Sequence, residues 1–581
     1  MNDFLTILKK DLFLLIDKMI SDNIINSSFK KFSISIDYLS KSKQGDVSSN
    51  IYILIKKNLI DTQFDLNKFI KENLENISYI QKIEIAKVGF VNIFLKNELI
   101  SSQIKELFKN KDFFGNNNSG LGKKINVEFV SANPTGPIHI AHLRGAVMGD
   151  VLSSILSCTG YQVTKEYYVN DAGSQIDILG KSLLKRYYQL FDKDIKISED
   201  EYPGLYLIDL AKKIKENDKD KWLKFDKNKT AEYFKNYAVT ELMKLIENDL
   251  KSININFNKF TYESAIVKNK LIDKLFSLLN KKKLLYEGYL EKPEGDDNKD
   301  WKPRKQLIFK STNYYDEKDR ALKKTDGEWT YFANDAAYHY DKFLRKYSLL
   351  INIWGADHIG YINRMKSIVE VFSEKKDFLD VRICQIVRLL KDKKVLKMSK
   401  REGNFITLND LLKFVDYNSI RYFMVSSKNE TPMDFDIDKV VSKNKDNPVF
   451  YCQYAYARAS SVINKSKKYE EFKNLDKLIN NFDPSTLSIY EWNLIIKILS
   501  WPYLLFQISE SKQPHKLTNY LEELSSNFHS FWNMGKDNDT LRLFDLNNKN
   551  KTLTKLIWIE SFRIVLKRAF NIIGIDAPES M

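Results

Sequence analysis

The feature that most constrains the fold is a segment in which an apolar run passes through a proline- and glycine-containing loop into a helical pattern. The apolar run covers Ile125–Val130, and the loop reads Ser131-Ala-Asn-Pro-Thr-Gly-Pro-Ile-His139. From Ile140 to Leu156, apolar residues recur at the spacing of one helix face. Another strand is expected at Val163–Tyr168, after Gly160. Strand, loop, helix and strand in this order predict the opening of a parallel sheet.

The remaining chain changes pattern along its length, and its 581 residues should hold several domains. Residues 1–112 are expected to form an α+β domain, with a helix around Phe4–Ile16. Residues 113–440 should contain the parallel sheet, with a largely helical insertion at about 180–320. Residues 447–581 read as helical without a strand signal. Other expected strands are Phe32–Asp37, Val91–Leu95, a hairpin of Tyr286–Leu290 with Gln306–Lys310, and Ile351–Trp354.

Composition narrows the class of protein. Hydrophobic residues make up 43% of the chain, enough to build sizeable cores. No apolar run approaches the ~18–20 residues of a membrane span, and acidic residues interrupt the N-terminal helix, so neither a span nor a signal peptide is expected. The 3 cysteines are far apart, which argues against a disulfide framework or zinc cluster and suits a reducing cytoplasm.

The chain is strongly basic. Its formal net charge is +16, from 92 basic and 76 acidic residues. A polyanionic partner is the natural inference. The alternative is a general richness in lysine and asparagine, because both recur throughout the chain, so charge alone favours nucleic acid only modestly.

Two histidines at the end of the loop suit a phosphate site. His139 and His142 stand at the start of the expected helix. A helix N-terminus offers N–H donors and positive partial charge to a phosphate, and ring nitrogens can donate to oxygens that gain charge in a transition state. Gly136 permits a close backbone approach. A pair of structural histidines is the alternative, which weakens because the chain has only 6 histidines.

A basic motif lies far downstream, at Lys397-Met-Ser-Lys-Arg401, and Gly403 follows it. A loop of this charge can cover a pyrophosphate and offset charge that builds at the α-phosphate. A solvated lysine loop is the alternative in so lysine-rich a chain. Met398, Gly403 and the histidine motif upstream favour the functional interpretation.

Together, the two motifs resemble the paired nucleotide signatures of class I aminoacyl-tRNA synthetases. Over nearly its full length, the chain resembles the bacterial arginyl-tRNA synthetases. The order and spacing of five segments carry this resemblance, and the C-terminal Gly574–Met581 adds to it. The segments are Glu128–Asp150, Tyr167–Asp177, Trp329–His339, Trp354–Tyr361 and Lys397–Asn404.

The resemblance implies that the substrate is L-arginine. A guanidinium is a planar fork of donors and requires carboxylates in matching geometry. Asp335 matches the family residue that pairs with it, and Tyr331 can stack on or hydrogen-bond the substrate. The residues implied in arginine binding are Glu128, Asn133, Asn170, Asp171, Gln175, Tyr331 and Asp335. The alternatives are a helix cap for Asp335, core packing for Tyr331, a salt bridge for Glu128, and turn or cap roles for Asn170, Asp171 and Gln175.

The resemblance also implies an ATP site and its catalytic residues. ATP binding falls to Asn133, Pro134, Thr135, Gly136, His139, His142, Asp357, His358, Lys397, Met398, Ser399 and Lys400, and catalysis to His139, His142, Lys397 and Lys400. Capping is the alternative for Asp357 and His358. One residue departs from the family pattern, because Ala141 stands where the family has the glycine against which adenine lies. Overpacking costs about 1–3 kcal/mol where nothing relaxes, so we expect weaker ATP binding at worst.

The flanking regions are similar to RNA-contacting parts of the family. Residues 1–112 resemble the N-terminal domain that contacts the tRNA elbow, a match carried by Val88–Leu95. Residues 447–581 resemble the anticodon-binding helical bundle. Tyr451, Tyr454 and Arg458 are candidates for RNA contact, because splayed bases stack on aromatic rings and arginine. Core packing is the commoner fate of such residues.

The sequence therefore predicts a multidomain α/β fold, with a Rossmann-like parallel-sheet catalytic core and its insertion, an N-terminal α+β domain and a C-terminal all-α helical bundle. The resemblance implies ATP-dependent attachment of L-arginine to its cognate tRNA through an arginyl-adenylate. Mg²⁺ should accompany ATP, with no metal held by the protein. A cytoplasmic monomer without a membrane partner is expected.

Three alternatives remain. Another class I synthetase would need the zinc-binding cysteines of the cysteine enzyme or the editing insertion of the branched-chain enzymes, and neither is visible. A non-catalytic RNA-binding relative has only Ala141 in its favour. A small-molecule ligase with the same nucleotide fold is disfavoured by the long C-terminal helical region.

Overall fold

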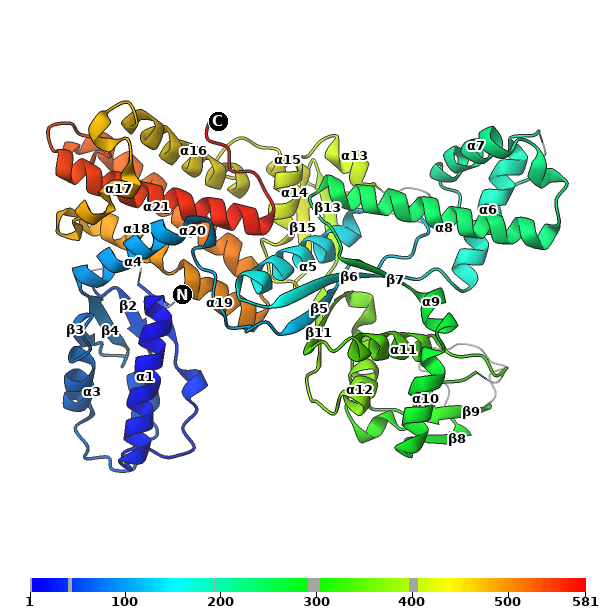
Figure 1. Cartoon of the computed structure of the whole chain (residues 1–581), viewed down its shortest axis with the longest axis horizontal. Coiled ribbons are helices and arrows are strands. Elements are labelled where there is room, and N and C mark those ends of the chain that lie inside the picture. The colour runs from blue at the N-terminus through cyan, green and yellow to red at the C-terminus, as the bar shows by residue number, and fades with distance from the viewer. Residues whose placement is uncertain (1–2, 40–43, 193, 291–302, 325, 397–405) are drawn as a thin grey trace. The chain divides into compact units, whose positions relative to one another are not determined.

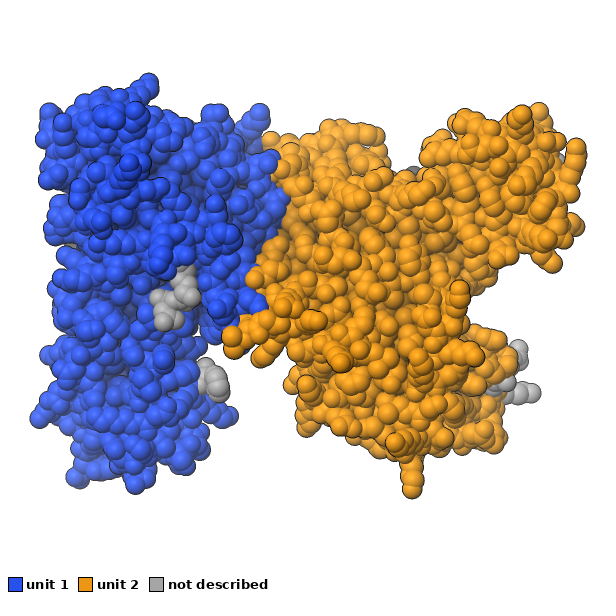
Figure 2. All heavy atoms as spheres, in the orientation of Figure 1, with its two compact units in different colours: residues 1–119, 158–160, 442–581 blue, residues 120–157, 161–441 orange. Residues whose placement is uncertain are grey.

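The computed structural model describes residues 3–39, 44–192, 194–290, 303–324, 326–396 and 406–581. They form two compact units (Figures 1 and 2). Unit 1 contains residues 1–119, 158–160 and 442–581, and unit 2 contains residues 120–157 and 161–441. None of the described helices combines the length and the apolar character that crossing a membrane would require.

Unit 2 is built around a parallel sheet of five strands in the order β12-β11-β5-β6-β7. The strands are β5 (Lys124–Glu128), β6 (Gln162–Val169), β7 (Lys259–Tyr262), β11 (Leu349–Gly355) and β12 (Leu379–Cys384). The chain builds outward from β5 through β6 to β7, and then returns to the other side of β5 for β11 and β12. The strand order therefore reverses between β5 and β11, and in parallel sheets ligands bind outside the carboxyl ends of the strands at such a point.

The predicted opening of the sheet is confirmed. Helix α5 (Ile140–Cys158) follows the proline- and glycine-containing loop, and β6 pairs with β5 in parallel register. Nearly all of α5 is buried, from Leu143 to Leu156. Gly149 packs so tightly that a methyl group there would lie 2.2 Å from the ring of Phe129. This glycine lets α5 approach the residue that follows β5.

The stretch from about 180 to 320 is not a single insertion. Helices α6 (Ser174–Gln189), α7 (Tyr206–Asp218) and α8 (Lys227–Ser252) leave the sheet after β6, but the chain returns to it at β7. Figure 1 shows these three helices together, and they share an aromatic core that includes Tyr187, Trp222 and Phe234. The strand β7 spans four residues, too few to give a clear alternation in the sequence.

A second excursion follows β7. It contains α9 (Glu263–Lys268), α10 (Leu271–Lys281), a small sheet and then α11 (Tyr331–Leu344). The predicted hairpin is confirmed by antiparallel pairing of β8 (Leu285–Tyr289) with β9 (Lys305–Phe309). The small sheet also includes β10 (Arg320–Ala321).

Past β11, a short helix η6 (Ala356–Tyr361) and α12 (Ile362–Ser373) lead to β12, and a three-stranded sheet follows. That sheet joins β13 (Val387–Lys391), β14 (Lys394–Val395) and β15 (Met433–Asp436). Sequence patterns did not predict it. Helices α13 (Leu408–Leu412) and α14 (Tyr417–Met424) lie between β14 and β15 in the chain.

Unit 1 contains the N-terminal α+β domain. Its sheet has the order β1-β2-β4-β3, from β1 (Ile36–Tyr38), β2 (Val47–Ser49), β3 (Ile80–Ile85) and β4 (Val91–Leu95). Its helices are α1 (Phe4–Ser21), α2 (Ile51–Lys56), α3 (Leu66–Glu75) and α4 (Asn97–Asn110). The predicted helix and the strand at Val91–Leu95 are confirmed.

The strand predicted at Phe32–Asp37 is wrong over its first half. Residues Lys31–Ser33 form a 3₁₀ turn instead. The side chain of Asn50 accepts a hydrogen bond from the Ser35 amide at 2.8 Å and donates to the Ser33 carbonyl at 3.1 Å. The backbone polar groups here form hydrogen bonds with a side chain rather than with a neighbouring strand. The alternating hydrophobic pattern therefore does not produce a β-ladder at this point.

The remainder of unit 1 is helical over the described residues past 447, as predicted. Its longer helices are α16 (Pro448–Ser466), α18 (Ile489–Leu499), α19 (Trp501–Ser511), α20 (His515–Asp537) and α21 (Lys549–Ile573). Trp501 and Trp558 are fully buried in this bundle. The Trp501 indole N–H donates to the Phe114 carbonyl at 3.0 Å.

Two glycines of α5 make a matched test of its packing. Gly149→Ala should lower the free energy of unfolding of unit 2 by about 1–3 kcal/mol, because the new methyl group overlaps Phe129. Gly145→Ala is the control, since its methyl group would lie an ordinary 3.8 Å from Ile353 and alanine is the better helix former by roughly 1 kcal/mol. Thermal unfolding of both variants checks this; equal melting temperatures would contradict the proposed close contact.

Candidate functional site

The residues singled out in unit 2 gather at the carboxyl ends of β5, β6 and β11. Glu128 is the last residue of β5, and Asn170 and Asp171 come directly after β6. Asp357 and His358 follow β11 within η6, while Tyr331 and Asp335 lie in the first turns of α11. Elements far apart in the sequence therefore bring one set of polar side chains to the point where the strand order reverses.

A strained turn opens the loop after β5. Val130 has φ +66° and Ser131 has φ +41°, a region that is unfavourable above all for a β-branched residue. The Ser131 hydroxyl donates to the Glu128 carboxylate at 3.0 Å and accepts from the Tyr168 amide at 3.1 Å. The Tyr167 hydroxyl donates to the Ala132 carbonyl at 2.7 Å. These bonds from β5 and β6 hold the turn in its unfavourable conformation and thereby fix the direction of the loop.

The two histidines lie against one another at the N-terminus of α5. Their ring centroids are 3.8 Å apart with the planes inclined by 31°. The His139 amide faces the His142 Nδ1 at 3.4 Å. Ala141 between them is exposed. The helix start supplies partial positive charge at the same place.

The lysine motif, Lys397, Met398, Ser399 and Lys400, lies outside the described residues. The described segment that follows it is next to the histidines. Thr407 forms an antiparallel bridge with His139, and the Leu408 amide donates to the Ile138 carbonyl at 2.8 Å. The start of α13 and the start of α5 are thus joined through their backbones.

Acidic side chains cluster beside the first turns of α11. Asp335 is half-buried, and its burial raises the pKa of its carboxyl to about 7, an effect that the nearby Tyr361 hydroxyl opposes and the charges of Glu263 and Glu128 strengthen. Burial also raises the pKa of Glu263, which is only 4% exposed, although a hydrogen bond from Asn334 at 2.7 Å opposes this. Burial likewise raises the pKa of Tyr168, and both acids add to the effect. Two carboxyls whose pKa values burial raises, with the charge of Glu263 adding to the rise at Asp335, form a site suited to a cation.

A chain of buried hydrogen bonds runs behind this cluster. The Lys342 ammonium, fully buried, donates to Glu128 Oε2 at 2.6 Å and to Asn352 Oδ1 at 3.2 Å. The Asn352 amide donates to His339 Nε2 at 2.8 Å, and His339 Nδ1 faces the Asp335 carbonyl at 2.8 Å. Burial, and then the charge of Lys342, lower the pKa of His339 to about 3. The ring is therefore neutral, with its proton on Nδ1, because a carbonyl can only accept.

The chain segment after β6 contacts the loop after β5. The Asn133 amide donates to Gln175 Oε1 at 2.8 Å, which joins two predicted residues directly. Asp171 accepts from the Ser264 amide at 2.9 Å and from its hydroxyl at 2.5 Å, and so holds the first turn of α9. Asn170, with its amide oriented to satisfy its neighbours, donates to Glu263 at 2.8 Å.

Three predicted residues face solvent. Tyr331 is 61% exposed. Its hydroxyl lies near Gly173, because a methyl group added to that glycine would be 3.5 Å from the hydroxyl oxygen. Asp357 and His358 are exposed and lie beside each other at 3.5 Å. All three stand at the edge of the acidic cluster or of β11 with polar atoms open to a ligand.

Four further residues of this site were not found from the sequence. Glu263, Lys342, Tyr361 and His339 each carry a polar group within the cluster or its hydrogen-bonded support. Glu263 follows β7, a strand that the sequence pattern did not reveal. A polar residue inside a helix, as for Lys342 and His339, gives no signal of its own until the partner on β5 or β11 is known.

The RNA candidates of α16 pack against α20. The Arg458 guanidinium lies over the Tyr454 ring at 4.2 Å and over the Trp532 ring at 5.2 Å, and one of its nitrogens is 3.0 Å from His529 Nδ1. Tyr451, Tyr454 and Arg458 are all half-buried. Their exposed portions are available to a ligand, while the rest of each side chain contributes to the bundle.

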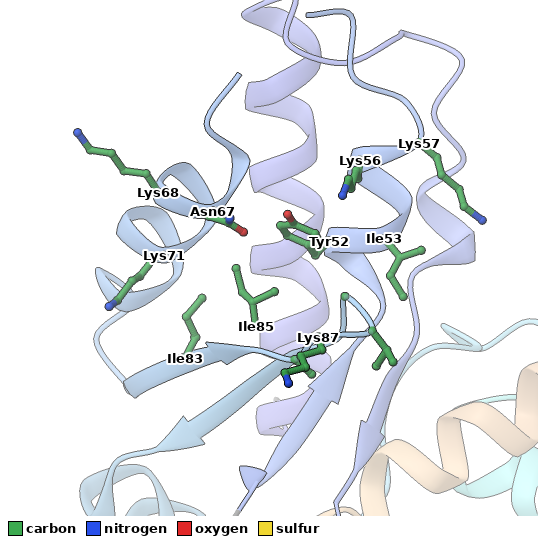
Figure 3. Close-up of a pocket in the computed structure, with 13 residues that line it drawn as sticks. Tyr52, Ile53, Lys56, Lys57, Asn67, Lys68, Lys71, Ile83, Ile85 and Lys87 are labelled. Atoms are coloured by element: carbon green, nitrogen blue, oxygen red, sulfur yellow. The ribbon is translucent and has the colours of Figure 1, made fainter. Parts of the chain in front are cut away.

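A basic groove of about 820 Å³ lies in the N-terminal domain. Figure 3 shows Tyr52 and Ile85 at its centre, between α2 and α3, with lysine side chains around them. The lysines that line the groove are Lys56, Lys57, Lys68, Lys71 and Lys87. An apolar, aromatic floor with a cationic border suits a polyanion that presents bases, such as a nucleic acid.

Comparisons with known proteins agree with this geometry. Residues 103–442 match the family model for the class I (R) tRNA synthetase catalytic domain, residues 14–95 that for the arginyl tRNA synthetase N terminal domain, and residues 452–581 that for the DALR anticodon binding domain. The arginine–tRNA ligase of Jannaschia sp. (strain CCS1) is 36% identical over 97% of this chain and 98% of its own. That of Orientia tsutsugamushi (strain Ikeda) is 39% identical over 99% of each.

The fold is also found in a solved structure. The arginyl-tRNA synthetase of Thermus thermophilus superposes with a TM-score of 0.71, covering 97% of this chain and all of that one at 17% identity. At this identity the likeness concerns the fold alone. It agrees with the parallel-sheet core, the N-terminal domain and the C-terminal helical domain described above.

The buried ion pair gives a test of the support behind the site. Lys342→Met should lower the free energy of unfolding by about 3–5 kcal/mol, because it leaves the Glu128 carboxylate buried without a counter-ion. Adding Glu128→Gln should recover much of this loss, since both charges are then gone. Urea unfolding of the two single variants and the double variant measures the coupling. Lys346→Met, at an exposed position, is the control, and purely additive losses would contradict the pairing.

Proposed function

The chain belongs to the arginyl-tRNA synthetase family, and we propose that it attaches L-arginine to its cognate tRNA with ATP, through an arginyl-adenylate. It is a class I arginine–tRNA ligase. The single observation that best supports arginine as substrate is the cluster of Asp335 and Glu263, two carboxyls whose pKa values burial raises, with the charge of Glu263 adding to the rise at Asp335. A guanidinium, always charged and rich in donors, is the side chain that such a pair favours.

In this proposal the amino acid binds at the acidic cluster. Asp335 receives the guanidinium and Tyr331 covers it from the solvent side. Glu128 already accepts from Lys342 and Ser131, so it acts through its charge and through the strained loop that it anchors. Asn133 and Gln175, which contact each other, serve the amino-acid end of the substrate together with Asn170 and Asp171.

ATP is proposed to occupy the adjoining loop and helix start. His139 and His142 donate to the triphosphate at the N-terminus of α5, and Lys397 and Lys400 add positive charge in the second motif. Loop residues Pro134, Thr135 and Gly136 present backbone to the nucleotide, Asp357 and His358 serve its ribose and adenine, and Met398 and Ser399 complete the second motif.

The reaction needs positioning and charge rather than a protein nucleophile. An arginine carboxylate oxygen attacks the α-phosphorus, and the bond to the β-phosphate breaks to release pyrophosphate. A terminal tRNA hydroxyl then attacks the carbonyl carbon, so that AMP leaves with the bonding electron pair and the hydroxyl proton is lost. Donors fixed around the triphosphate stabilise the charge that develops on it. Mg²⁺ bound to the phosphates would neutralise part of that charge.

The remaining elements of the proposal concern tRNA binding, the cellular compartment and the oligomeric state. The basic groove of the N-terminal domain and the helical domain with Tyr451, Tyr454 and Arg458 are the proposed tRNA contacts, and binding through lysines should weaken with salt. We propose a cytoplasmic monomer, and a reducing cytoplasm fits the cysteines, because Cys158, Cys384 and Cys452 form no disulfide.

Arginine-dependent ATP–pyrophosphate exchange tests the proposed reaction. We expect exchange with arginine and with none of the other standard amino acids, measured with and without total bacterial tRNA. The family commonly makes the adenylate only with tRNA bound, so dependence on tRNA is the expected result. Exchange driven by another amino acid would overturn the substrate. If no amino acid supports exchange although tRNA still binds, the non-catalytic alternative is correct, and Ala141→Gly is the variant to examine next.

The acidic cluster predicts how arginine binding depends on pH. The guanidinium favours the ionised carboxylate, so below about pH 7 arginine must displace a proton from Asp335. The dissociation constant should therefore rise by about tenfold per pH unit as the pH falls below 7, and should be nearly constant above it. Calorimetry between pH 5.5 and 8.5 (roughly the range that brackets this pKa) measures both affinity and proton release.

Asp335→Asn is the matched variant for this prediction. It keeps the shape of the side chain but removes the titrating group, so arginine should bind more weakly and with a flatter pH profile. ATP affinity in the same variant should stay unchanged, because Asp335 belongs to the amino-acid side of the proposed site. A pH profile like that of the wild type would contradict the role of Asp335.

A further inference from the structure

The helices between β6 and β7 touch the histidine loop at two points. The first is Tyr206, the initial residue of α7. Its hydroxyl donates to the Thr135 carbonyl at 2.5 Å. Its ring packs on the next residue of the loop, because a methyl group on Gly136 would lie 3.3 Å from the Tyr206 hydroxyl and 3.5 Å from the adjoining ring carbon.

The second point is Asp249, near the end of α8. Its side chain is enclosed, with the residue only 2% exposed. One carboxylate oxygen accepts from the Ile138 amide at 3.2 Å, and the other accepts from the Asn409 side chain at 2.8 Å. A single carboxylate therefore holds both the residue that precedes His139 and the second residue of α13.

The partners of Asp249 make its position notable. Both are neutral donors, and a buried carboxylate that has no counter-ion among the described residues costs more than a buried amide would. Burial accordingly raises the pKa of Asp249 to about 6, while the hydrogen bonds from Ile138 and Asn409 oppose that rise. An uncharged residue at this position would give a more stable core. A carboxylate, however, can accept hydrogen bonds from two directions at once.

The contacts close around one short stretch of backbone. The Leu408 amide donates to the Ile138 carbonyl at 2.8 Å, and Thr407 pairs with His139. Thr407 in turn caps α13 through a reciprocal capping box with Asp410. With Tyr206 on Thr135 and Asp249 on Ile138, the loop is fixed on both sides of Gly136-Pro137.

We propose that Tyr206 and Asp249 are positioning residues that fix the histidine loop and the first turn of α13 in the register needed for nucleotide binding. Neither is expected to touch substrate. Their effect passes through Thr135 and Ile138 to His139 and His142. The inference rests on the proposed function, because it assigns the histidine loop to ATP. Displacing such a loop by about 1 Å can cost up to roughly a hundredfold in rate.

Kinetics of three variants at Asp249 and its neighbour test the proposal. In arginine-dependent pyrophosphate exchange with tRNA present, Asp249→Ala should raise the KM for ATP and lower kcat by at least about tenfold, while the KM for arginine changes by less than about twofold. Asp249→Asn should stay within about threefold of wild type, since its amide oxygen still accepts from Ile138 and Asn409 can reorient. Asn248→Ala, at the exposed neighbour in α8, is the control.

Two further variants keep the test decisive. Tyr206→Phe retains the ring on Gly136 but loses the hydroxyl, and should raise the KM for ATP without changing the melting temperature by more than a few degrees. If Asp249→Ala does not fold, Asn409→Ala removes one partner only and should show the same selective loss for ATP. Equal changes in both KM values, or an unchanged KM for ATP in a folded Asp249→Ala, would overturn the proposal.

Direct ATP binding by equilibrium dialysis separates this inference from the proposed function. Absence of arginine-dependent exchange in the wild type would refute the proposed function. Weaker ATP binding by Asp249→Ala than by wild type would still support the positioning role in that case. Equal ATP binding by the two proteins would refute it.

Discussion

The ion pair between Lys342 and Glu128 is the interaction on which the candidate site depends. It joins α11 to the end of β5 in a fully buried setting, at 2.6 Å. Such a pair rarely adds much stability by itself, but breaking it leaves a buried charge. Here the pair also anchors two sides of the candidate site, because Glu128 holds Ser131 of the strained loop and Lys342 holds Asn352 and, through it, His339.

The charges around the pocket then follow from burial. Glu128 is compensated by Lys342, whereas the carboxyl of Asp335 has a pKa raised to about 7 and that of Glu263 is also raised. Glu128 therefore supports the structure, whereas Asp335 and Glu263 are the carboxyls that we propose bind a cation. In the proposed function, these carboxyls would gain charge-assisted hydrogen bonds from a bound guanidinium. This division explains how one small region can hold several carboxyls without being unstable.

The nucleotide side is organised differently, through backbone contacts. The loop after β5 carries its strain at Val130 and Ser131 and is held by side chains of β6, α7 and α8. Phosphate recognition at a helix start depends on where the backbone N–H groups point. If the loop binds the nucleotide as proposed, hydrogen bonds from three elements would fix the direction of these N–H groups.

The sequence by itself determined the strand–loop–helix opening, the hairpin, the helical C-terminal region and the family, since these follow from local periodicity and from motifs of fixed spacing. It placed His139 and His142 correctly at the start of a helix. It could not reveal β7, Glu263 or Lys342. The four-residue strand β7 is too short to show a periodic hydrophobic pattern. The role of a buried polar residue depends on a partner that is distant in the chain. The tertiary structure alone decided which acid is neutralised, which remains available, and which helices hold the loop, because burial and hydrogen-bond partners exist only once the sheet has assembled.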